Sequence, residues 1–362
     1  MNNRKKRIAL LFGGQSTEHR VSCLSAATVA RAVDSEKYDL LLVGITEEGR
    51  WLRARSVDDI VSGAWRRGTE GAVLLPDASL KSVLLRSERG CELLPVDIVF
   101  PVLHGLYGED GCPQAVAELA QIPYVGCGVL SSALTMDKAV TKAVLSRLGI
   151  PQTLFLAFRR EELADFAPVA AAVEEKIGYP AFVKPANAGS SCGISRASNR
   201  EELRCALKLA ASQDCKVIIE AEVRGRELEC ALLGGWDAKT GGVGEILAAS
   251  AFYDYDAKYK NPASKTVVAP RLPAGKSDEI RAMALKVYRA LDCRGLARAD
   301  FFLEEGTGRV IFSEINTIPG FTAISMYPKL WEAAGLPLKE LVQRLIDGAA
   351  VTDHFAEPPA LR

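Results

Sequence analysis

The chain has 362 residues, 48% of them hydrophobic, and its 45 lysines and arginines balance its 45 aspartates and glutamates. This length and composition predict a globular protein of two or three domains with a substantial core. The neutral net charge excludes the strong positive field that is typical of nucleic-acid-binding proteins and of proteins attracted to anionic membranes, so we expect neither partner.

The N-terminal sequence and the cysteines indicate a cytoplasmic protein. The apolar segment that follows the basic run at 4–7 ends at Gly13, so it is too short for a signal peptide or a membrane span. The nine cysteines form no CxxC pair and no zinc-binding spacing, and we interpret them as reduced, mostly buried thiols. We therefore expect a cytoplasmic location.

The first 127 residues alternate apolar strands with helices, a pattern typical of an open α/β layer. The Gly-Cys-Gly sequence at 126–128 predicts a hinge, so we place the first domain boundary after residue 127. The predicted elements are strands at 8–12, 40–45, 98–103 and 123–126, and helices at 21–33 and 113–120.

Residues 128–220 are predicted to form a central domain, and residues 221–350 a larger C-terminal α+β domain. The C-terminal domain is predicted to hold a β-hairpin and a polar lid at about 251–270, and residues 351–362 are interpreted as a poorly anchored tail. The other predicted elements are helices at 138–148, 161–176, 200–211 and 338–346, and strands at 153–157, 181–184 and 216–221.

The most informative segment is the predicted hairpin that begins near Arg298. A turn at 306–308 separates two apolar runs, so we expect Asp300 opposite Glu314 and Arg298 opposite Asn316. Residues two apart on a strand point the same way, so all four side chains are expected on one face. Two carboxylates and an amide suit Mg²⁺, and the guanidinium suits a phosphate. The alternative is a solvated face with cross-strand ion pairs.

Two further segments are candidates for nucleotide binding. Lys184 opens a loop of small residues that ends at Gly193, and such a loop lets backbone N–H groups approach phosphate oxygens closely. No Walker A sequence occurs, and an ordinary turn is the alternative. Further along, we interpret Glu227 either as a ligand for ribose hydroxyls or, like Glu229, as a solvated carboxylate.

Substrate residues are expected where strands of the first domain end, because ligands bind at this edge of open α/β sheets. Glu18 is a candidate to bind an amino group, or it only caps the following helix. His104 lies in a glycine-rich turn and is a candidate to orient a substrate, or a structural histidine. The tyrosines and lysines at 252–260 predict a lid that brings Lys258 to a phosphate and excludes water.

Together these motifs closely resemble those of D-alanine:D-alanine ligases, which are ATP-grasp enzymes. The sequences GGQSTEH, LHGLYGEDG, TMDK, VKPANAGSSCG, FYDYDAKY, RGLARADFF and EINTIPGFT occur in the family's order, and the resemblance extends from about residue 8 to 346. It implies three α/β domains, with ATP between the central and C-terminal domains and the amino acids against the N-terminal one. It also implies an ATP-dependent ligase of peptidoglycan precursor synthesis that joins two D-alanines through an acyl phosphate, with Mg²⁺ or Mn²⁺ as two ions, and a homodimer.

The resemblance further implies a role for each matching residue. ATP would be bound by Lys138, Lys184, Ser191, Glu220, Val223 and Glu227, and the metal by Asp300, Glu314 and Asn316. The first D-alanine would contact Glu18, Ser190 and Tyr259, and the oxyanion would be stabilised by Arg298 and the N–H of Gly320. Other substrate contacts would come from His104, Lys258 on the lid, and Ser325 and Met326 beside the second amino acid.

Departures from the family pattern leave the second substrate open. Arg20 stands where an acidic residue is usual, and Met326 where leucine or arginine is usual. Tyr259 favours D-alanine, whereas the stretch 261–265 resembles the D-alanine:D-serine ligases of vancomycin-resistant bacteria. A D-alanine:D-serine ligase is therefore one alternative. A non-catalytic nucleotide-binding regulator is the other, and the intact hairpin residues argue against it.

Overall fold

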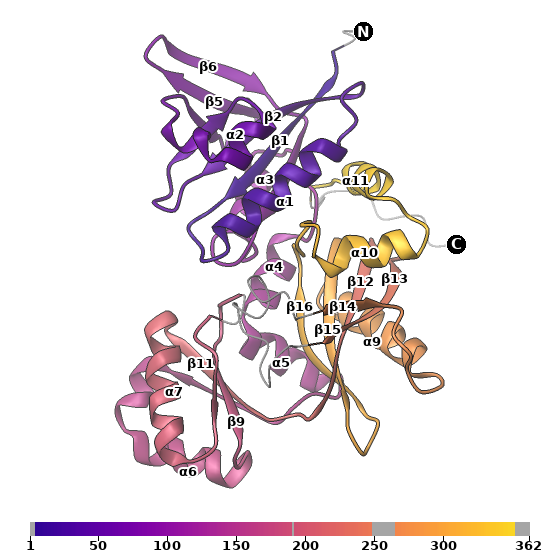
Figure 1. Cartoon of the computed structure of the whole chain (residues 1–362). Helices are drawn as coiled ribbons and strands as arrows, with labels where there is room; N and C mark the ends of the chain where they lie inside the picture. Colours follow the sequence, from indigo (N-terminus) through magenta and orange to yellow (C-terminus); the bar gives the residue numbers. More distant parts are fainter. Residues whose placement is uncertain (1–3, 190–191, 248–264, 352–362) are drawn as a thin grey trace, which may run out of the picture.

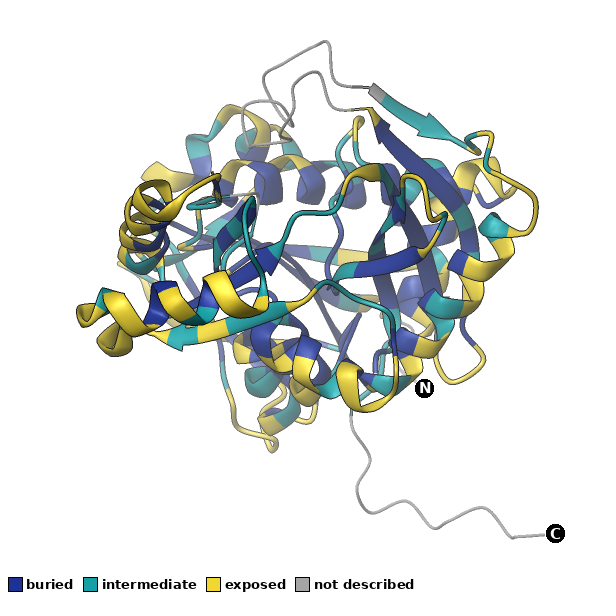
Figure 2. Ribbon diagram, turned by 90° about the horizontal axis from the view of Figure 1, so that it is seen from below, coloured by how far each residue is buried: buried dark blue, intermediate teal, exposed yellow. Residues whose placement is uncertain are grey.

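The computed structural model describes residues 4–189, 192–247 and 265–351. In these residues the chain forms three β-sheets with helices packed against them, which confirms the expected α/β class (Figure 1). The first and second sheets lie at opposite ends of the view in Figure 1, and the C-terminal sheet lies beside both. Figure 2 shows the buried strands in dark blue inside helices whose outer faces are exposed.

The first sheet has seven strands in the order β6-β5-β4-β3-β2-β1-β7. β1 pairs in parallel with β2 and β7, whereas β2 to β6 pair antiparallel. Alternate residues of β1 join two apolar clusters, one shared with α1 and the other with α3, so this strand is buried on both faces. The elements are β1 (Lys6–Gly13), α1 (His19–Ala32), β2 (Tyr38–Ile45), β3 (Trp51–Ala54), α2 (Val57–Ser62), the 3₁₀ helix η1 (Ala64–Arg67), β4 (Gly71–Leu74), β5 (Ser82–Ser87), β6 (Gly90–Pro95), β7 (Ile98–Leu103) and α3 (Cys112–Leu119).

The predicted elements of this layer are confirmed with one exception. The strand predicted at 123–126 is wrong, because Tyr124 forms only isolated bridges, to Val99 and to Ala350. The sequence also gave no signal for β3 to β6. These strands are short, and β6 is largely exposed, so they lack the continuous apolar run that marks β1 and β7.

The second sheet has four antiparallel strands in the order β10-β9-β11-β8. Asp137 caps α5 by accepting the N–H groups of Ala139 and Val140, and this cap fixes Lys138 as the first residue of the helix. The helix predicted at 161–176 is in fact a 3₁₀ turn followed by α6, because Asp165 caps a new start. The elements are α4 (Val129–Met136), α5 (Lys138–Arg147), β8 (Phe155–Arg159), η2 (Arg160–Ala164), α6 (Phe166–Lys176), β9 (Ala181–Pro185), β10 (Ser195–Ala197), α7 (Arg200–Gln213) and β11 (Lys216–Ala221).

The third sheet has five antiparallel strands in the order β14-β13-β12-β15-β16. Its hairpin confirms the predicted register, since Asp300 lies opposite Glu314 and Arg298 opposite Asn316. On the other face of the hairpin, aromatic rings pack against α9 in an apolar cluster. The elements are β12 (Gly225–Gly234), β13 (Lys239–Leu247), β14 (Lys265–Val268), α9 (Lys276–Ala290), β15 (Gly295–Glu304), β16 (Val310–Asn316), α10 (Met326–Ala333) and α11 (Leu338–Asp347).

The C-terminal helices join the third sheet to the first layer. One apolar cluster contains residues of β1 and α1 together with residues of α10, α11 and β12. In Figure 1, α11 lies to the right of α1, at the lower edge of the first layer, and α10 lies over the third sheet. No helix in the described part of the chain is long and apolar enough to cross a membrane.

A glycine contact also connects the layers and can be tested. Gly295 has φ +72°, and a Cβ on it would lie 2.8 Å from the Cα of Gly126. Gly295→Ala therefore combines left-handed strain with a backbone clash, and we expect it to lower the free energy of unfolding by about 3 kcal/mol. Gly306→Ala is the control, because Gly306 has φ +79° but no atom within 4 Å of its Cβ position. Equal losses in urea denaturation would contradict the close-contact argument.

Candidate functional site

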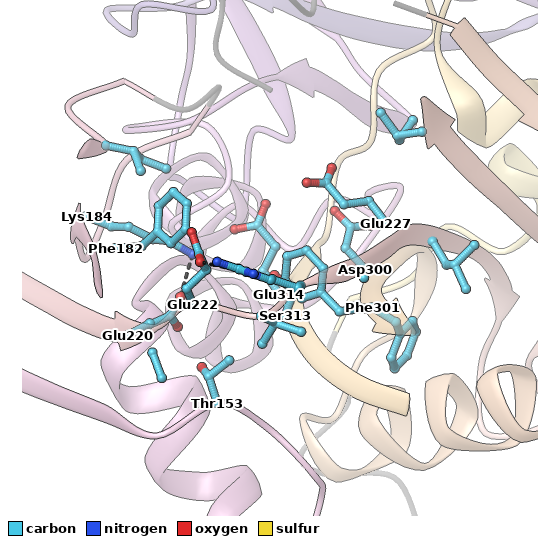
Figure 3. Close-up of a pocket in the computed structure, with 18 of the residues that line it drawn as sticks. Thr153, Phe182, Lys184, Glu220, Glu222, Glu227, Asp300, Phe301, Ser313 and Glu314 are labelled. Carbon is cyan, nitrogen blue, oxygen red and sulfur yellow. Dashed lines mark hydrogen bonds and ion pairs between the residues drawn. The ribbon is translucent and has the colours of Figure 1, made fainter. Parts of the chain in front are cut away.

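Seven of the predicted residues line one cavity of about 560 Å³ between the second and third sheets (Figure 3). The β9 and β11 strands supply one wall, and β12, β15 and β16 supply the other. Phe182, Ile246 and Phe301 give the cavity apolar surface beside its charged groups. This size and mixture suit a small-molecule ligand. The seven are Lys184, Glu220, Val223, Glu227, Arg298, Asp300 and Glu314.

One wall carries a carboxylate held between two ammonium groups. Glu220 lies 2.5 Å from Lys184 Nζ and 2.8 Å from Lys142 Nζ. Burial alone would raise the pKa of Glu220, but the two lysines overcome this effect and lower it to about 2. The carboxylate thus stays ionised and orients both lysines. The wall keeps one surplus positive charge beside the cavity, which suits a phosphate.

Lys142 is a site residue that sequence reasoning missed. Its side chain is almost completely buried, and its ammonium also donates to Thr153 Oγ1 at 3.2 Å. Its spacing from Lys138 could have indicated this role, because a residue four positions further along lies on the same face of α5.

Lys138 connects the small-residue loop to the hairpin. Its Nζ donates to the carbonyl oxygen of Ala188 at 2.7 Å and lies 3.5 Å from Glu314 Oε2. The capped start of α5 therefore places an ammonium between the candidate phosphate loop and a candidate metal ligand.

The opposite wall carries the reverse arrangement, a cation between carboxylates. Arg298 is 8% exposed, and its Nε and Nη2 donate to the two oxygens of Asp300 at 2.8 and 2.6 Å. Its Nε also lies 3.2 Å from Glu229 Oε1. Burial raises the pKa of Asp300 to about 7, and Glu229 and Glu314 raise it while Arg298 opposes them. The interpretation of Glu229 as solvated was wrong, because it is only 8% exposed.

The predicted metal ligands form a set of oxygen donors. The described residues include no group of three or more His, Cys, Asp or Glu side chains arranged to hold a metal. Asp300 and Glu314 nevertheless face each other across the hairpin, and, after burial, the negative charge of Glu314 is one of the causes of the raised pKa of Asp300. Asn316 adds an amide whose Oδ1 accepts the N–H of Ile318 at 3.0 Å. Two carboxylates and an amide fit Mg²⁺, which is commonly held by one or two carboxylates plus substrate phosphates.

A second group of predicted residues lies where the first layer meets the third sheet. Glu18 is buried, and a Cβ on Gly189 would lie only 2.2 Å from its Oε2, so its carboxylate lies against the small-residue loop. His104 contacts Ser25 Oγ through Nε2 at 3.3 Å, and Ser25 Oγ accepts the N–H of Phe321 at 3.1 Å. The two strand ends of the first layer thus reach the other parts of the site.

Glu109 is a second residue that sequence reasoning left without a role. Its two oxygens accept the N–H groups of Gly105 at 2.7 Å and of Ile318 at 3.2 Å, so it joins the glycine-rich turn to the loop after β16. Burial and the nearby Glu18 raise the pKa of Glu109 to about 8. The sequence gave little indication of this role, because Ile318 is about two hundred residues away in the chain and only the fold brings it to Glu109.

The remaining predicted residues lie in different surroundings. Ser325 Oγ accepts the N–H of Thr322 at 3.0 Å and would lie 2.7 Å from a Cβ on Gly320. Met326 is buried in the apolar cluster, with its sulfur against Gly244. The predicted residues Ser190, Ser191, Lys258 and Tyr259, and most of the predicted lid, lie outside the described residues.

Comparisons with known proteins agree with this arrangement. A family profile described as D-ala D-ala ligase N-terminus matches residues 7–127, and one described as D-ala D-ala ligase C-terminus matches residues 144–347. The chain belongs to the D-alanine–D-alanine ligase family. Membership in this family makes it a ligase and implies ATP use.

Relatives and solved structures of this family cover nearly the whole chain. The D-alanine–D-alanine ligases of Acetivibrio thermocellus and Ruminiclostridium cellulolyticum are 47% and 46% identical to it, and each match covers 95% of both sequences. The crystal structure of VanG D-Ala:D-Ser ligase from Enterococcus faecalis has a TM-score of 0.86 at 37% identity and covers 95% of this chain and 99% of that one. The D-alanine–D-alanine ligase from Coxiella burnetii has a TM-score of 0.82 at 33% identity, with 95% and 93% covered. The expected ATP-grasp architecture is thereby confirmed.

The lysine–glutamate cluster gives a testable pH effect. The folded pKa of Glu220, about 2, lies below the ordinary glutamate value of 4.5, so the stabilisation is present above about pH 4.5 and lost as the pH falls toward 2. Lys142→Met removes one cation and raises the folded pKa. We expect a loss of about 2 kcal/mol at pH 7, below the roughly 3–5 kcal/mol for a wholly unpaired buried charge, because Lys184 remains.

The measurement is acid unfolding followed by circular dichroism, where the midpoint of Lys142→Met should move to higher pH. Lys276→Met is the control, since it removes an ion pair with Glu279 at 2.7 Å in which the glutamate is 42% exposed. Such pairs contribute about 0.2–1 kcal/mol. An unchanged midpoint for Lys142→Met would refute the buried cluster as a source of stability.

Proposed function

We propose that this protein is an ADP-forming D-alanine–D-alanine ligase. The observation that carries the proposal is one cavity in which Lys184 faces a hairpin with Arg298, Asp300 and Glu314, with the ammonium of Lys138 3.5 Å from Glu314. Cations for phosphates and oxygen ligands for a metal are the groups that phosphoryl transfer from ATP requires. The names of its relatives supply the amino-acid substrate.

We assign ATP to this cavity. The segment between β11 and β12, which includes Val223, supports the adenine, and Glu227 binds the ribose. Lys138 and Lys184 contact the phosphates, with Ser191 as a further predicted contact. Besides its predicted contact with ATP, Glu220 pairs with Lys184 and so orients its ammonium.

We assign Mg²⁺ or Mn²⁺, as two ions, to Asp300, Glu314 and Asn316. When bound, the metal would neutralise charge on the transferred phosphoryl group. The carboxylates are already fixed by the hairpin register, and no large rearrangement of the backbone is needed to offer their oxygens.

The amino acids would lie between the first layer and the loop after β16. Glu18 binds the ammonium of the first D-alanine, together with Ser190 and Tyr259, and His104 orients a substrate. Ser325 and Met326 belong to the second amino-acid site, where the buried Met326 would act through packing. Lys258 would close over the phosphates from the lid.

The reaction needs no protein nucleophile. The first D-alanine's carboxylate attacks the γ-phosphorus, the bond to the β-phosphate oxygen breaks, and ADP and an acyl phosphate form. The deprotonated amine of the second D-alanine then attacks the acyl carbon, and the tetrahedral intermediate expels phosphate. Arg298 and the Gly320 N–H would stabilise the oxyanion of that intermediate. Positioning of the reactants supplies much of the remaining acceleration.

Three further expectations stay predictions. We place domain boundaries after residue 127, between α3 and α4, and after residue 220, near the end of β11, and we expect a homodimer in the cytoplasm. A D-alanine:D-serine ligase is the second candidate function, favoured by the structural match to VanG.

Purified protein with ATP, Mg²⁺ and D-alanine should release ADP and phosphate and form D-alanyl-D-alanine. Mass spectrometry of a reaction that contains equal D-alanine, D-serine and D-lactate should give the D-alanine dipeptide as the main product. A main product that contains D-serine would replace the proposal by the second candidate, and no product from any mixture would refute the ligase activity.

Removal of one metal ligand should affect turnover strongly. We expect Glu314→Gln to lower kcat by about 10²–10³-fold, because a developing charge loses stabilisation. The Mg²⁺ concentration needed for half-maximal rate should rise. Glu305→Gln is the control, since Glu305 is exposed at the turn of the same hairpin. Unchanged turnover of Glu314→Gln would show that the metal assignment is wrong.

A further inference from the structure

Arg298 pairs with Asp300 and Glu229, and Asp300 is also a proposed metal ligand. Both oxygens of Asp300 accept hydrogen bonds from Arg298, at 2.8 and 2.6 Å. Asp300 is also the central member of the proposed metal site. A metal ion on Asp300 would place a second cation on the carboxylate that pairs with Arg298, and the two cations would share its one negative charge, so metal binding weakens this pair. A guanidinium that is 8% exposed then needs another anion, because an unpaired buried charge is strongly destabilising.

Glu229 is placed to be that anion. It lies directly opposite Asp300 on the neighbouring strand β12, and its Oε1 is 3.2 Å from Arg298 Nε. Its other oxygen, Oε2, is buried and accepts no hydrogen bond from any described residue. Oε2 therefore offers an unused acceptor beside a cation with several N–H donors. A buried carboxylate oxygen without a partner is costly, so this acceptor calls for a function.

We propose that Glu229 is a positioning residue for Arg298. It holds the guanidinium toward the reacting carbonyl when Asp300 gives its oxygens to the metal. In the arrangement described above, Arg298 is shared by both carboxylates. With substrates bound, Glu229 becomes its main partner and accepts a second N–H through Oε2. This role rests on the proposed ligase function and deepens it, because it explains how one arginine and one metal ligand two residues apart act together.

The test compares Glu229→Gln with Glu245→Gln. Glu245 is 7% exposed and accepts two hydrogen bonds from Arg226, at 2.6 and 2.7 Å. It lies opposite Leu228, one residue from Glu229, so the two carboxylates point to opposite faces of the sheet. Both variants remove the charge of a buried glutamate that pairs with an arginine in the third sheet, but only Glu229 lines the cavity. The control thus matches the loss of a buried carboxylate without touching Arg298, although its partner Arg226 is 36% exposed.

We expect Glu229→Gln to lower kcat by about 10–100-fold, less than the roughly 10²–10³-fold for loss of an oxyanion donor. KM for ATP and for D-alanine should stay within about 3-fold, because the interaction matters in the transition state. Binding of a phosphinate dipeptide analogue, which mimics the tetrahedral intermediate, should weaken by the same factor as kcat. Mn²⁺ affinity should not change. Glu245→Gln should lower stability but leave kcat, both KM values, analogue binding and Mn²⁺ affinity unchanged.

Several results overturn the proposal. They are equal kinetics for Glu229→Gln and Glu245→Gln, a raised KM for ATP with unchanged kcat, and a loss of Mn²⁺ affinity, which would make Glu229 a metal ligand. If Glu229→Gln does not fold, Glu229→Asp carries the test, because the shorter side chain retains the charge but withdraws it from Arg298. Its kcat should fall at constant KM, and wild-type kcat would refute the role. Absence of dipeptide with the wild-type chain instead overturns the proposed function, and this role with it.

Discussion

Burial of charge between the second and third sheets sets the requirements that the rest of the site meets. The two walls of the cavity pair their buried charges in opposite ways. On one wall Glu220 lies between Lys142 and Lys184, so two cations share one anion. On the other wall Arg298 lies between Asp300 and Glu229, so two anions share one cation. Each cluster stabilises itself by pairing and still leaves a surplus of one sign, positive for phosphates and negative for a metal ion.

This division explains why the site needs two sheets. A single surface with the same residues would allow the lysines and carboxylates to neutralise one another completely. Separate walls keep each surplus facing the cavity, and Lys138 and Glu314 connect them at 3.5 Å. The first layer is then attached through the loop after β16, where Glu109 and Ser25 accept backbone N–H groups. Hydrogen bonds from backbone N–H groups, rather than ion pairs, therefore join the first layer to the rest of the site.

Local chemistry made part of this arrangement predictable. The hairpin register follows from the turn at 306–308 and the two apolar runs beside it, so Asp300 and Glu314 could be paired before the structure was known. Side-chain caps by Asp137, Asp165 and Asn199 likewise set the starts of α5, α6 and α7. The predictions from sequence were wrong where contacts between residues far apart in the chain decide burial or strand pairing. Glu229 is buried because β15 happens to be its neighbour, and the strand expected at 123–126 is replaced by single bridges to Val99 and Ala350.

The sequence by itself determined the family, the α/β class and the identity of the metal-site hairpin, because these depend on motifs, periodicity and pairings within about twenty residues. Only the tertiary structure decided which charges share a wall. Lys142 and Glu220 are far apart in the chain, as are Glu109 and Ile318, and nothing in their local sequence specifies the partner. Packing of α5 against β11 and of the first layer against the loop after β16 brings them together, and the cost of unpaired buried charge then fixes the role of the lysine–glutamate pair.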